Sequence, residues 1–433
     1  MNKGMFHNNI QLIDYLEFWV CNGKAFIKSY LEPLNFYIIG SKFNEKRTRI
    51  QYLLSNSLGQ LEIVDNLRVK SFDQQFIIVT SSISSKDTEF FEKTALHGDF
   101  IQNISFICRD INEAYEKAIK EGAQSISEPM TQELKGDSFY KSCSIQSPFN
   151  DLIHTFVNRK ITYHNSNPLH LFPGFNPVAI VNSEGEKPLQ LTGALDHIAT
   201  CVEPGNLPKY IDWYYRCMGF KLTAEECDTD SLENELVLDK NFYVIKKSDF
   251  KFIKKDNIGL KMAVLSNQPS NTKHFKVPPI QLVISEAMEN GEGQIEQYIQ
   301  YFNGGGVQHL AFHSFDIFKT VQHSKKEKLE YIYVPDSYYD GLHERFPWIT
   351  DEMKLNLKNS RVLIDSDNSL SKDIVDETEQ KVGFINQIFT KYCNDRPTLF
   401  FELIQRVDGL GFGKGNIIAL FEALETEKVS VNK

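Results

Sequence analysis

Two histidines and one glutamate, His197, His309 and Glu402, occupy three matched positions in the second copy of an internal sequence repeat. The paired segments are residues 13–18 with 195–200, 98–106 with 304–312, and 152–159 with 399–406. Two imidazoles and one carboxylate on one face of a metal ion form the ligand set of a mononuclear non-haem iron site, whose other face stays open to reactants. We therefore predict that these three side chains bind Fe(II).

The first copy of the repeat lacks these ligands. Tyr15, Asn103 and Thr155 stand where the two histidines and the glutamate stand in the second copy. We therefore expect a metal-free scaffold in the first half of the chain and the chemistry in the second half.

Zinc is the rival metal, because two histidines and one glutamate also bind zinc and activate a water molecule. Against zinc, the sequence has no HExxH motif and no obvious second carboxylate to act as a base. A lone histidine in an apolar strand is usually structural, which is our interpretation of the other histidines. The glycine-rich residues 411–415 lack the order of a phosphate-binding loop.

The elements that must position the ligands are strands with a helix between them. One apolar helical face is formed by Ile111, Ala114, Tyr115, Ala118 and Ile119. Gly122 follows as a helix-ending residue, and residues 101–107 before it are typical of a strand. The second copy repeats this order, with a strand at 307–312 and a helix from Asp316 onward. The pattern favours an α+β fold over a doubly wound parallel sheet.

The repeat also predicts how the chain divides. We expect an N-terminal domain at 1–160, a proline-containing linker at 161–190 and a C-terminal domain at 191–433. Residues 267–279 and the acidic stretch 365–381 are typical of loops, and residues 417–425 are typical of a helix.

Composition excludes several classes of function. The net charge of -10 gives no basic block for nucleic acid. No apolar run approaches the roughly 20 residues that span a bilayer, so we expect no membrane partner. Seven scattered cysteines and a polar N-terminus indicate a cytoplasmic protein with reduced thiols. A homo-oligomer is compatible with the sequence.

Specific motifs extend the interpretation to a family, because the chain from about residue 13 to 425 resembles the 4-hydroxyphenylpyruvate dioxygenase family. That family includes 4-hydroxymandelate synthase and lies in the vicinal oxygen chelate superfamily. The motifs that carry the resemblance are GVQHLA at 306–311, VPDSYY at 334–339, QIFTK at 387–391, DRPTLFFELIQR at 395–406 and GFGKGN at 411–416. The resemblance implies two tandem domains, each an open barrel of paired βαβββ modules, with iron in the second and a C-terminal gating helix.

The resemblance also implies a reaction and a pocket. A 2-oxo acid substrate, 4-hydroxyphenylpyruvate, and dioxygen would meet at Fe(II), with oxidative decarboxylation and hydroxylation to homogentisate. Catalytic roles would fall to Gln294, Gln308 and Gln387. Phe389 and Phe412 would sandwich the ring, with Ser266, Ser285 and Asn416 as further substrate contacts.

The sequence departs from the dioxygenase pattern in the pocket, which leaves the product open. Ser285-Glu286-Ala287 stands where the dioxygenases carry Asn-Glu-Pro, and Gly293 and Ile417 replace Ser and Phe. One alternative is a 4-hydroxymandelate synthase-like benzylic hydroxylation, and another is a relative acting on a different 2-oxo acid. A non-catalytic paired-barrel binding protein is the competing class, and the three retained ligands argue against it.

Overall fold

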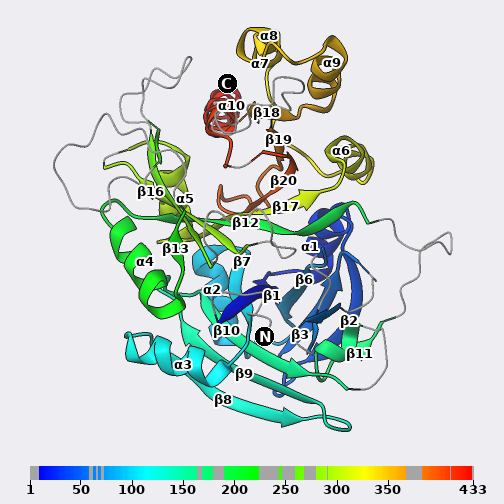
Figure 1. Cartoon of the computed structure of the whole chain (residues 1–433), viewed down its shortest axis with the longest axis vertical. Coiled ribbons are helices and arrows are strands. Elements are labelled where there is room, and N and C mark those ends of the chain that lie inside the picture. The colour runs from blue at the N-terminus through cyan, green and yellow to red at the C-terminus, as the bar shows by residue number, and fades with distance from the viewer. Residues whose placement is uncertain are drawn as a thin grey trace, which may run out of the picture.

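The computed structural model describes residues 9–57, 62–64, 67–69, 73–162, 168–178, 190–223, 243–245, 259–267, 279–289, 291–366, 383–409 and 411–431. Within these residues the fold is α+β, with two nine-stranded open sheets, one from each half of the chain. Helices cover the outside of the sheets (Figure 1).

The N-terminal sheet has the strand order β11-β2-β3-β6-β1-β7-β10-β9-β8. Its strands are β1 (Ile10–Trp19), β2 (Tyr37–Phe43), β3 (Arg49–Ser55), β6 (Phe76–Ser82), β7 (Phe100–Cys108), β8 (Ser125–Glu133), β9 (Phe139–Gln146), β10 (Ile153–Lys160) and β11 (Asn176–Pro177). A separate two-stranded sheet is formed by β4 (Glu62–Val64) and β5 (Leu67–Val69).

The C-terminal sheet has the order β13-β15-β16-β12-β17-β20-β19-β18, and β14 pairs with β15. Its strands are β12 (Thr192–Val202), β13 (Lys221–Leu222), β14 (Tyr243–Ile245), β15 (Leu260–Ser266), β16 (Gln281–Ala287), β17 (Gly306–Ser314), β18 (Leu363–Ser366), β19 (Phe384–Phe389) and β20 (Phe400–Val407).

The described helices are α1 (Gly23–Phe26), α2 (Thr88–His97), α3 (Ile111–Lys120), α4 (Leu207–Trp213), α5 (Gln294–Phe302), α6 (Ile317–Lys326), α7 (Asp336–Asp340), α8 (Leu342–Arg345), α9 (Asp351–Ser360) and α10 (Lys414–Val431). The helices α1–α3 of the first half recur in the same order as α4–α6 in the second half, to which α7–α10 are added. Both α1 and α4 continue into a π-helical turn, Ile27–Leu31 and Tyr214–Met218. None of the described helices is long and apolar enough to cross a membrane.

Local chemistry explains the predicted helices. The Asp110 side chain accepts hydrogen bonds from the backbone N–H groups of Asn112 and Glu113 at the start of α3. Gly122 adopts φ +100° just after α3, a conformation that favours glycine. Asp316 starts α6 by accepting from the N–H of Lys319. The helices at 111–119 and from Asp316 are therefore confirmed.

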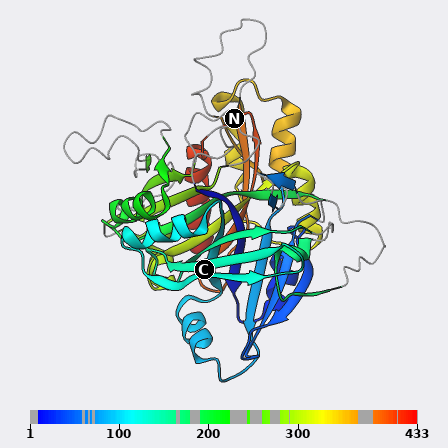
Figure 2. The same ribbon diagram turned by 60° about the horizontal axis from the view of Figure 1, so that its bottom comes forward.

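The outer faces of the two sheets meet in one apolar core. Phe18 of β1 lies against Phe401 of β20 with ring centroids 6.1 Å apart, and Phe36 contacts Phe312 of β17 at 5.2 Å. Figure 2 shows the blue and cyan strands of the first half lying beside the strands of the second, and α3 contacts the π-helical turn Tyr214–Met218 that follows α4. Burial of these rings joins the two halves into one body.

The structure describes only part of the predicted loops at 267–279 and 365–381. The prediction of a loop at 365–381 is wrong at its start, because Asp365 and Ser366 of β18 pair with Ile385 and Phe384 of β19. Most of 267–279 and the rest of 365–381 lie outside the described residues. In the expected linker, β11 pairs with β2 of the first sheet, and the domain limits at 160 and 190 stay a prediction.

Candidate metal centre

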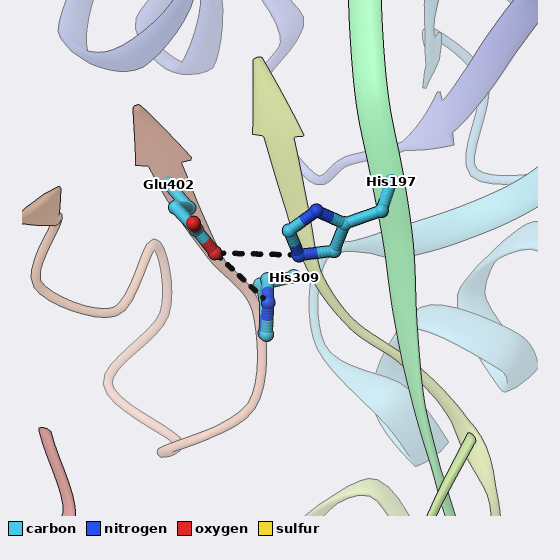
Figure 3. Close-up of side chains that lie close together, drawn as sticks. All are labelled: His197, His309 and Glu402. Carbon is cyan, nitrogen blue, oxygen red and sulfur yellow. Dashed lines mark ion pairs between the residues drawn. The ribbon is translucent and has the colours of Figure 1, made fainter. Parts of the chain in front are cut away.

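The structure brings the three predicted ligands together from three neighbouring strands. Nε2 of His197 on β12 lies 3.4 Å from Oε2 of Glu402 on β20, and Nε2 of His309 on β17 lies 3.3 Å from the same oxygen. All three ligand atoms lie within 4.8 Å of one another. The three side chains point toward one point from β12, β17 and β20 (Figure 3).

Strand register explains this convergence. β17 lies between β12 and β20, antiparallel to the first and parallel to the second. Ala199, two residues after His197, is paired with His309. Ala311, two residues after His309, is paired with Glu402. The three ligands therefore lie close together across the three strands. Side chains alternate between the faces of a strand, which places all three on the inner face. A register shift next to His197 adjusts the aim of that side chain.

Both imidazoles have their Nδ1 atoms engaged and their Nε2 atoms turned toward Glu402. Nδ1 of His197 lies 2.8 Å from Oδ1 of Asp196, and Nδ1 of His309 lies 3.3 Å from Oε1 of Gln308. An N–H donated from Nδ1 leaves the Nε2 lone pair for a metal. The carboxylate partner of His197 thus selects the tautomer that a ligand needs.

The carboxylate of Glu402 is held in a similar way. Nε2 of Gln387 donates to Oε1 of Glu402 at 2.8 Å, which leaves Oε2 facing the histidines. Oε1 of Gln387 accepts a hydrogen bond from Nδ2 of Asn416 in α10 at 2.7 Å. The hydroxyl of Tyr338 donates to Oδ1 of Asn416 at 3.1 Å. A continuous chain of hydrogen bonds therefore joins Glu402 to the C-terminal helix.

Burial and neighbouring charges shift the pKa of each group in this cluster. Burial lowers the pKa of His197, but Glu402 and Asp196 outweigh burial and raise it to about 9. Burial lowers the pKa of His309, and Glu402 offsets this only in part. Burial raises the pKa of Glu402, but the histidines outweigh this and lower it to about 2. Burial raises the pKa of Asp196 too, yet Arg406 and His197 hold it well below its usual range.

The donor set fits a divalent transition metal. Two imidazole nitrogens and one carboxylate oxygen converge, each fixed by a hydrogen bond from behind. The buried carboxylates give the cluster a negative charge that a bound metal cation would neutralise. In the metal-free protein, a proton on His197 neutralises this charge. Donor types alone do not separate iron from zinc.

Aromatic rings line the centre. The ring of Phe412 lies edge-on to His197 with centroids 5.2 Å apart, and Phe389 lies edge-on to His309 at 6.3 Å. Phe400, which the sequence did not single out, stacks on His309 at 4.8 Å. These buried rings give the two histidines apolar neighbours.

The remaining predicted pocket residues lie on the same inner face or at its edge. Ser285 pairs with Cys201 and Met262 in the sheet, and Ser266 lies near the end of β15. Gln294 begins α5 and carries a buried Oε1 atom without a hydrogen-bond partner. Their roles as substrate contacts stay predictions.

Sequence reasoning missed two residues that the structure places behind the ligands. Arg406 donates from Nε to Oδ2 of Asp196 at 2.7 Å and from Nη2 to Oδ1 at 2.8 Å. This two-point contact fixes the carboxylate that orients His197. A signal was present in the repeat, because Asp14 and Arg159 stand at the matching positions of the first copy.

The first half shows what the same positions become without ligands. Nδ2 of Asn103 donates to Oγ1 of Thr155 at 2.9 Å and lies 3.4 Å from the hydroxyl of Tyr15. These three residues cluster at the place that matches the metal centre, but none offers an imidazole or a carboxylate. The expected correspondence between the two copies is therefore confirmed in space.

Comparisons with known proteins agree with this fold. The profile of the Glyoxalase/Bleomycin resistance protein/Dioxygenase superfamily matches residues 194–355. The chain is 22% identical to a triple mutant of 4-hydroxymandelate synthase from Streptomyces coelicolor, with a TM-score of 0.68 over 97% of this chain and 99% of that one. The second likeness supports the fold alone.

Sequence relatives identify the family. An uncharacterized 4-hydroxyphenylpyruvate dioxygenase-like protein of Dictyostelium discoideum is 51% identical over 97% of this chain and 96% of its own length. The 4-hydroxyphenylpyruvate dioxygenase of Danio rerio is 27% identical over 98% of this chain and 92% of its own. The chain therefore belongs to the 4-hydroxyphenylpyruvate dioxygenase-like family of metal-dependent dioxygenases.

Proposed function

We propose that the protein is an Fe(II)-dependent dioxygenase that oxidatively decarboxylates and hydroxylates 4-hydroxyphenylpyruvate, with homogentisate as product. The observation that carries this proposal is the convergence of His197, His309 and Glu402. Three protein ligands on one side leave coordination positions for both a 2-oxo acid and dioxygen. The relatives named 4-hydroxyphenylpyruvate dioxygenase support the choice of substrate.

Fe(II) bound there would supply the activation of dioxygen and the chelation of the 2-oxo acid. The protein's own groups orient the reactants. Gln387 holds Glu402, and Asn416 holds Gln387, so the ligands and α10 keep one geometry. Phe412 and Phe389 would flank the aromatic ring of the substrate. Fixing both reactants at one centre makes the reaction effectively unimolecular.

Benzylic hydroxylation to 4-hydroxymandelate is the second candidate, and Ser285 favours it. This buried serine lies between Cys201 and Met262, where an asparagine in the dioxygenase pattern would offer a longer amide. A shorter polar group allows the ring a different position relative to the oxidant. The same reasoning extends to a relative that acts on another 2-oxo acid.

The experiment is anaerobic loading of metal-free protein with Fe(II), followed by 4-hydroxyphenylpyruvate and oxygen. We expect oxygen uptake with Fe(II) and none with Zn(II), and a product that chromatography assigns, because homogentisate and 4-hydroxymandelate share a formula. Glu402→Gln should abolish uptake, whereas Thr155→Ala at the matching position of the first half should not. No uptake with any 2-oxo acid would refute the proposal.

The described cysteines, Cys21, Cys108, Cys143, Cys201, Cys217 and Cys393, are free thiols. Free thiols support a reducing compartment, and we place the protein in the cytoplasm. We also propose two domains at 1–160 and 191–433, joined by a linker at 161–190, and proteolysis within 161–190 followed by mass spectrometry tests this division. Light scattering tests whether the protein forms a homo-oligomer.

A further inference from the structure

An aspartate–arginine pair occurs at the same place in both halves of the molecule. Arg159 of β10 donates to the Asp14 carboxylate of β1, and Arg406 of β20 donates to the Asp196 carboxylate of β12. Each aspartate lies at a register shift of its strand, directly before the position of Tyr15 or His197. The pair is therefore present both with and without metal ligands.

Each arginine has the same second set of partners. Nη1 of Arg159 donates to the carbonyl of Leu171 at 2.7 Å, and the guanidinium lies 5.2 Å from the ring centre of Phe172. Nη1 of Arg406 donates to the carbonyl of Gly411 at 2.6 Å, and its guanidinium lies 5.6 Å from the ring centre of Phe412. In both halves, the arginine thus holds a chain segment that follows its own strand, β10 or β20.

The phenylalanine of that segment covers the matching position in each half. Phe172 lies edge-on to Tyr15 at 5.9 Å, and Phe412 lies edge-on to His197 at 5.2 Å. The first half keeps this closed arrangement although Tyr15, Asn103 and Thr155 cannot bind a metal in the manner of His197, His309 and Glu402. The arrangement that Asp196, Arg406, Gly411 and Phe412 form in the second half is therefore a feature of the fold and does not depend on the metal ligands.

The second half adds a connection to chemistry. Asp196 receives the hydrogen bond from Nδ1 of His197 on the same oxygen that accepts from Nη2 of Arg406. The segment held by Arg406 leads directly into α10, whose Asn416 reaches Gln387 and hence Glu402. The ligands are therefore connected to the start of α10 in two ways, from His197 through Asp196 and Arg406, and from Glu402 through Gln387 and Asn416.

We propose that Arg406 and Asp196 are positioning residues that couple the orientation of the ligand His197 to closure of residues 411–416 over the centre. When the segment leaves, Arg406 loses the Gly411 carbonyl and the Phe412 ring, and the carboxylate that orients His197 loses its fixed partner. Coupling of this kind is reciprocal, so metal binding stabilises the closed segment as much as closure favours metal binding. This inference rests on the proposed metal site.

The test uses the full-length, metal-free protein and Co(II) as the probe, with its visible absorption as a spectroscopic signature. The variants are Arg406→Gln and, as the matched control in the first half, Arg159→Gln. We expect Arg406→Gln to weaken Co(II) binding about 10- to 100-fold, the effect typical of losing an outer partner of a ligand. Amide hydrogen exchange at 411–423 should become faster in this variant and should slow on Co(II) binding in the wild type.

The control separates coupling from general damage. Arg159→Gln should speed exchange at 169–175 and leave the Co(II) affinity and spectrum unchanged. Arg406→Lys keeps the charge but loses the two-point contact, so partial recovery of affinity is expected, and this variant serves if Arg406→Gln does not fold. Equal Co(II) affinity in wild type and both Arg406 variants overturns the coupling, as does an equal loss in Arg159→Gln. Wild-type protein that binds no Co(II) overturns the metal site as well.

Discussion

Replacing Glu402 with glutamine removes one negative charge from the buried cluster and keeps the side-chain shape. In the metal-free protein the raised pKa of His197, about 9, depends on Glu402 first among its charged neighbours and on Asp196 second. The variant therefore removes the main reason for His197 to hold a proton. It also removes one of three ligands, so Co(II) or Fe(II) binding should be lost.

The size of the stability effect follows from the two pKa values. An unfolded histidine titrates near 6.5, so a folded pKa of about 9 stabilises the fold fully below pH 6.5. This contribution declines as the pH rises through 9. At pH 7 it amounts to about 2 to 3 kcal/mol, of which we expect Glu402→Gln to remove the larger part.

Urea unfolding of both proteins, in the presence of a chelator, measures this effect at pH 7 and pH 10. We expect the variant to be less stable by about 1 to 2 kcal/mol at pH 7 and this pH-dependent part to vanish at pH 10. Thr155→Ala, the matching change in the first half, should show no such pH dependence. A stability difference of equal size at both pH values would refute the reasoning from His197.

Three further changes test other parts of the structure. Gly306→Ala should destabilise the protein by about 1 to 3 kcal/mol in thermal melting, because the new Cβ would lie 2.5 Å from Cε1 of Phe302. Gly341→Ala is the control, because a Cβ at Gly341 would have no atom within 4 Å. Burial lowers the pKa of His154 to about 3, so the stability of the wild type relative to His154→Gln should fall by about 1 kcal/mol from pH 7.5 to 5.5, which urea unfolding of both proteins measures. Asn416→Ala removes the hydrogen-bond donor to Gln387 and should speed amide exchange in the first turn of α10 roughly 5- to 100-fold. The control is Lys414→Ala, because Lys414 is exposed. Unchanged exchange in Asn416→Ala would contradict the role of Asn416 in holding α10.

Much of the fold could be predicted because its signals are local. The apolar spacing at 111–119 and the capping Asp110 specify α3 from neighbouring residues alone. The repeat paired Tyr15 with His197, and the strand registers of the two halves agree with that pairing. The loop predicted from the acidic residues at 365–381 is wrong at its start, because Asp365 gains its strand conformation from pairing with Ile385.

The role of Arg406 could not be predicted in this way. Its partners are Asp196, which is far away in the sequence, and Gly411, which lies beyond the end of β20. The arginine was visible in both copies, but its contacts depend on the register shift beside His197 and on the course of the following segment. Such contacts form only when the strands have assembled.

The sequence by itself determined the ligand types, their positions in a repeat and the helix and strand periods, since each of these depends on residue identity and spacing along the chain. Only the tertiary structure decided how His197 and Glu402 are oriented. Their hydrogen-bond partners Asp196 and Gln387 are held in turn by Arg406 and Asn416, from other elements. A carboxylate or an imidazole can bind a metal only when its lone pairs are aimed, and aim depends on partners that the fold brings together.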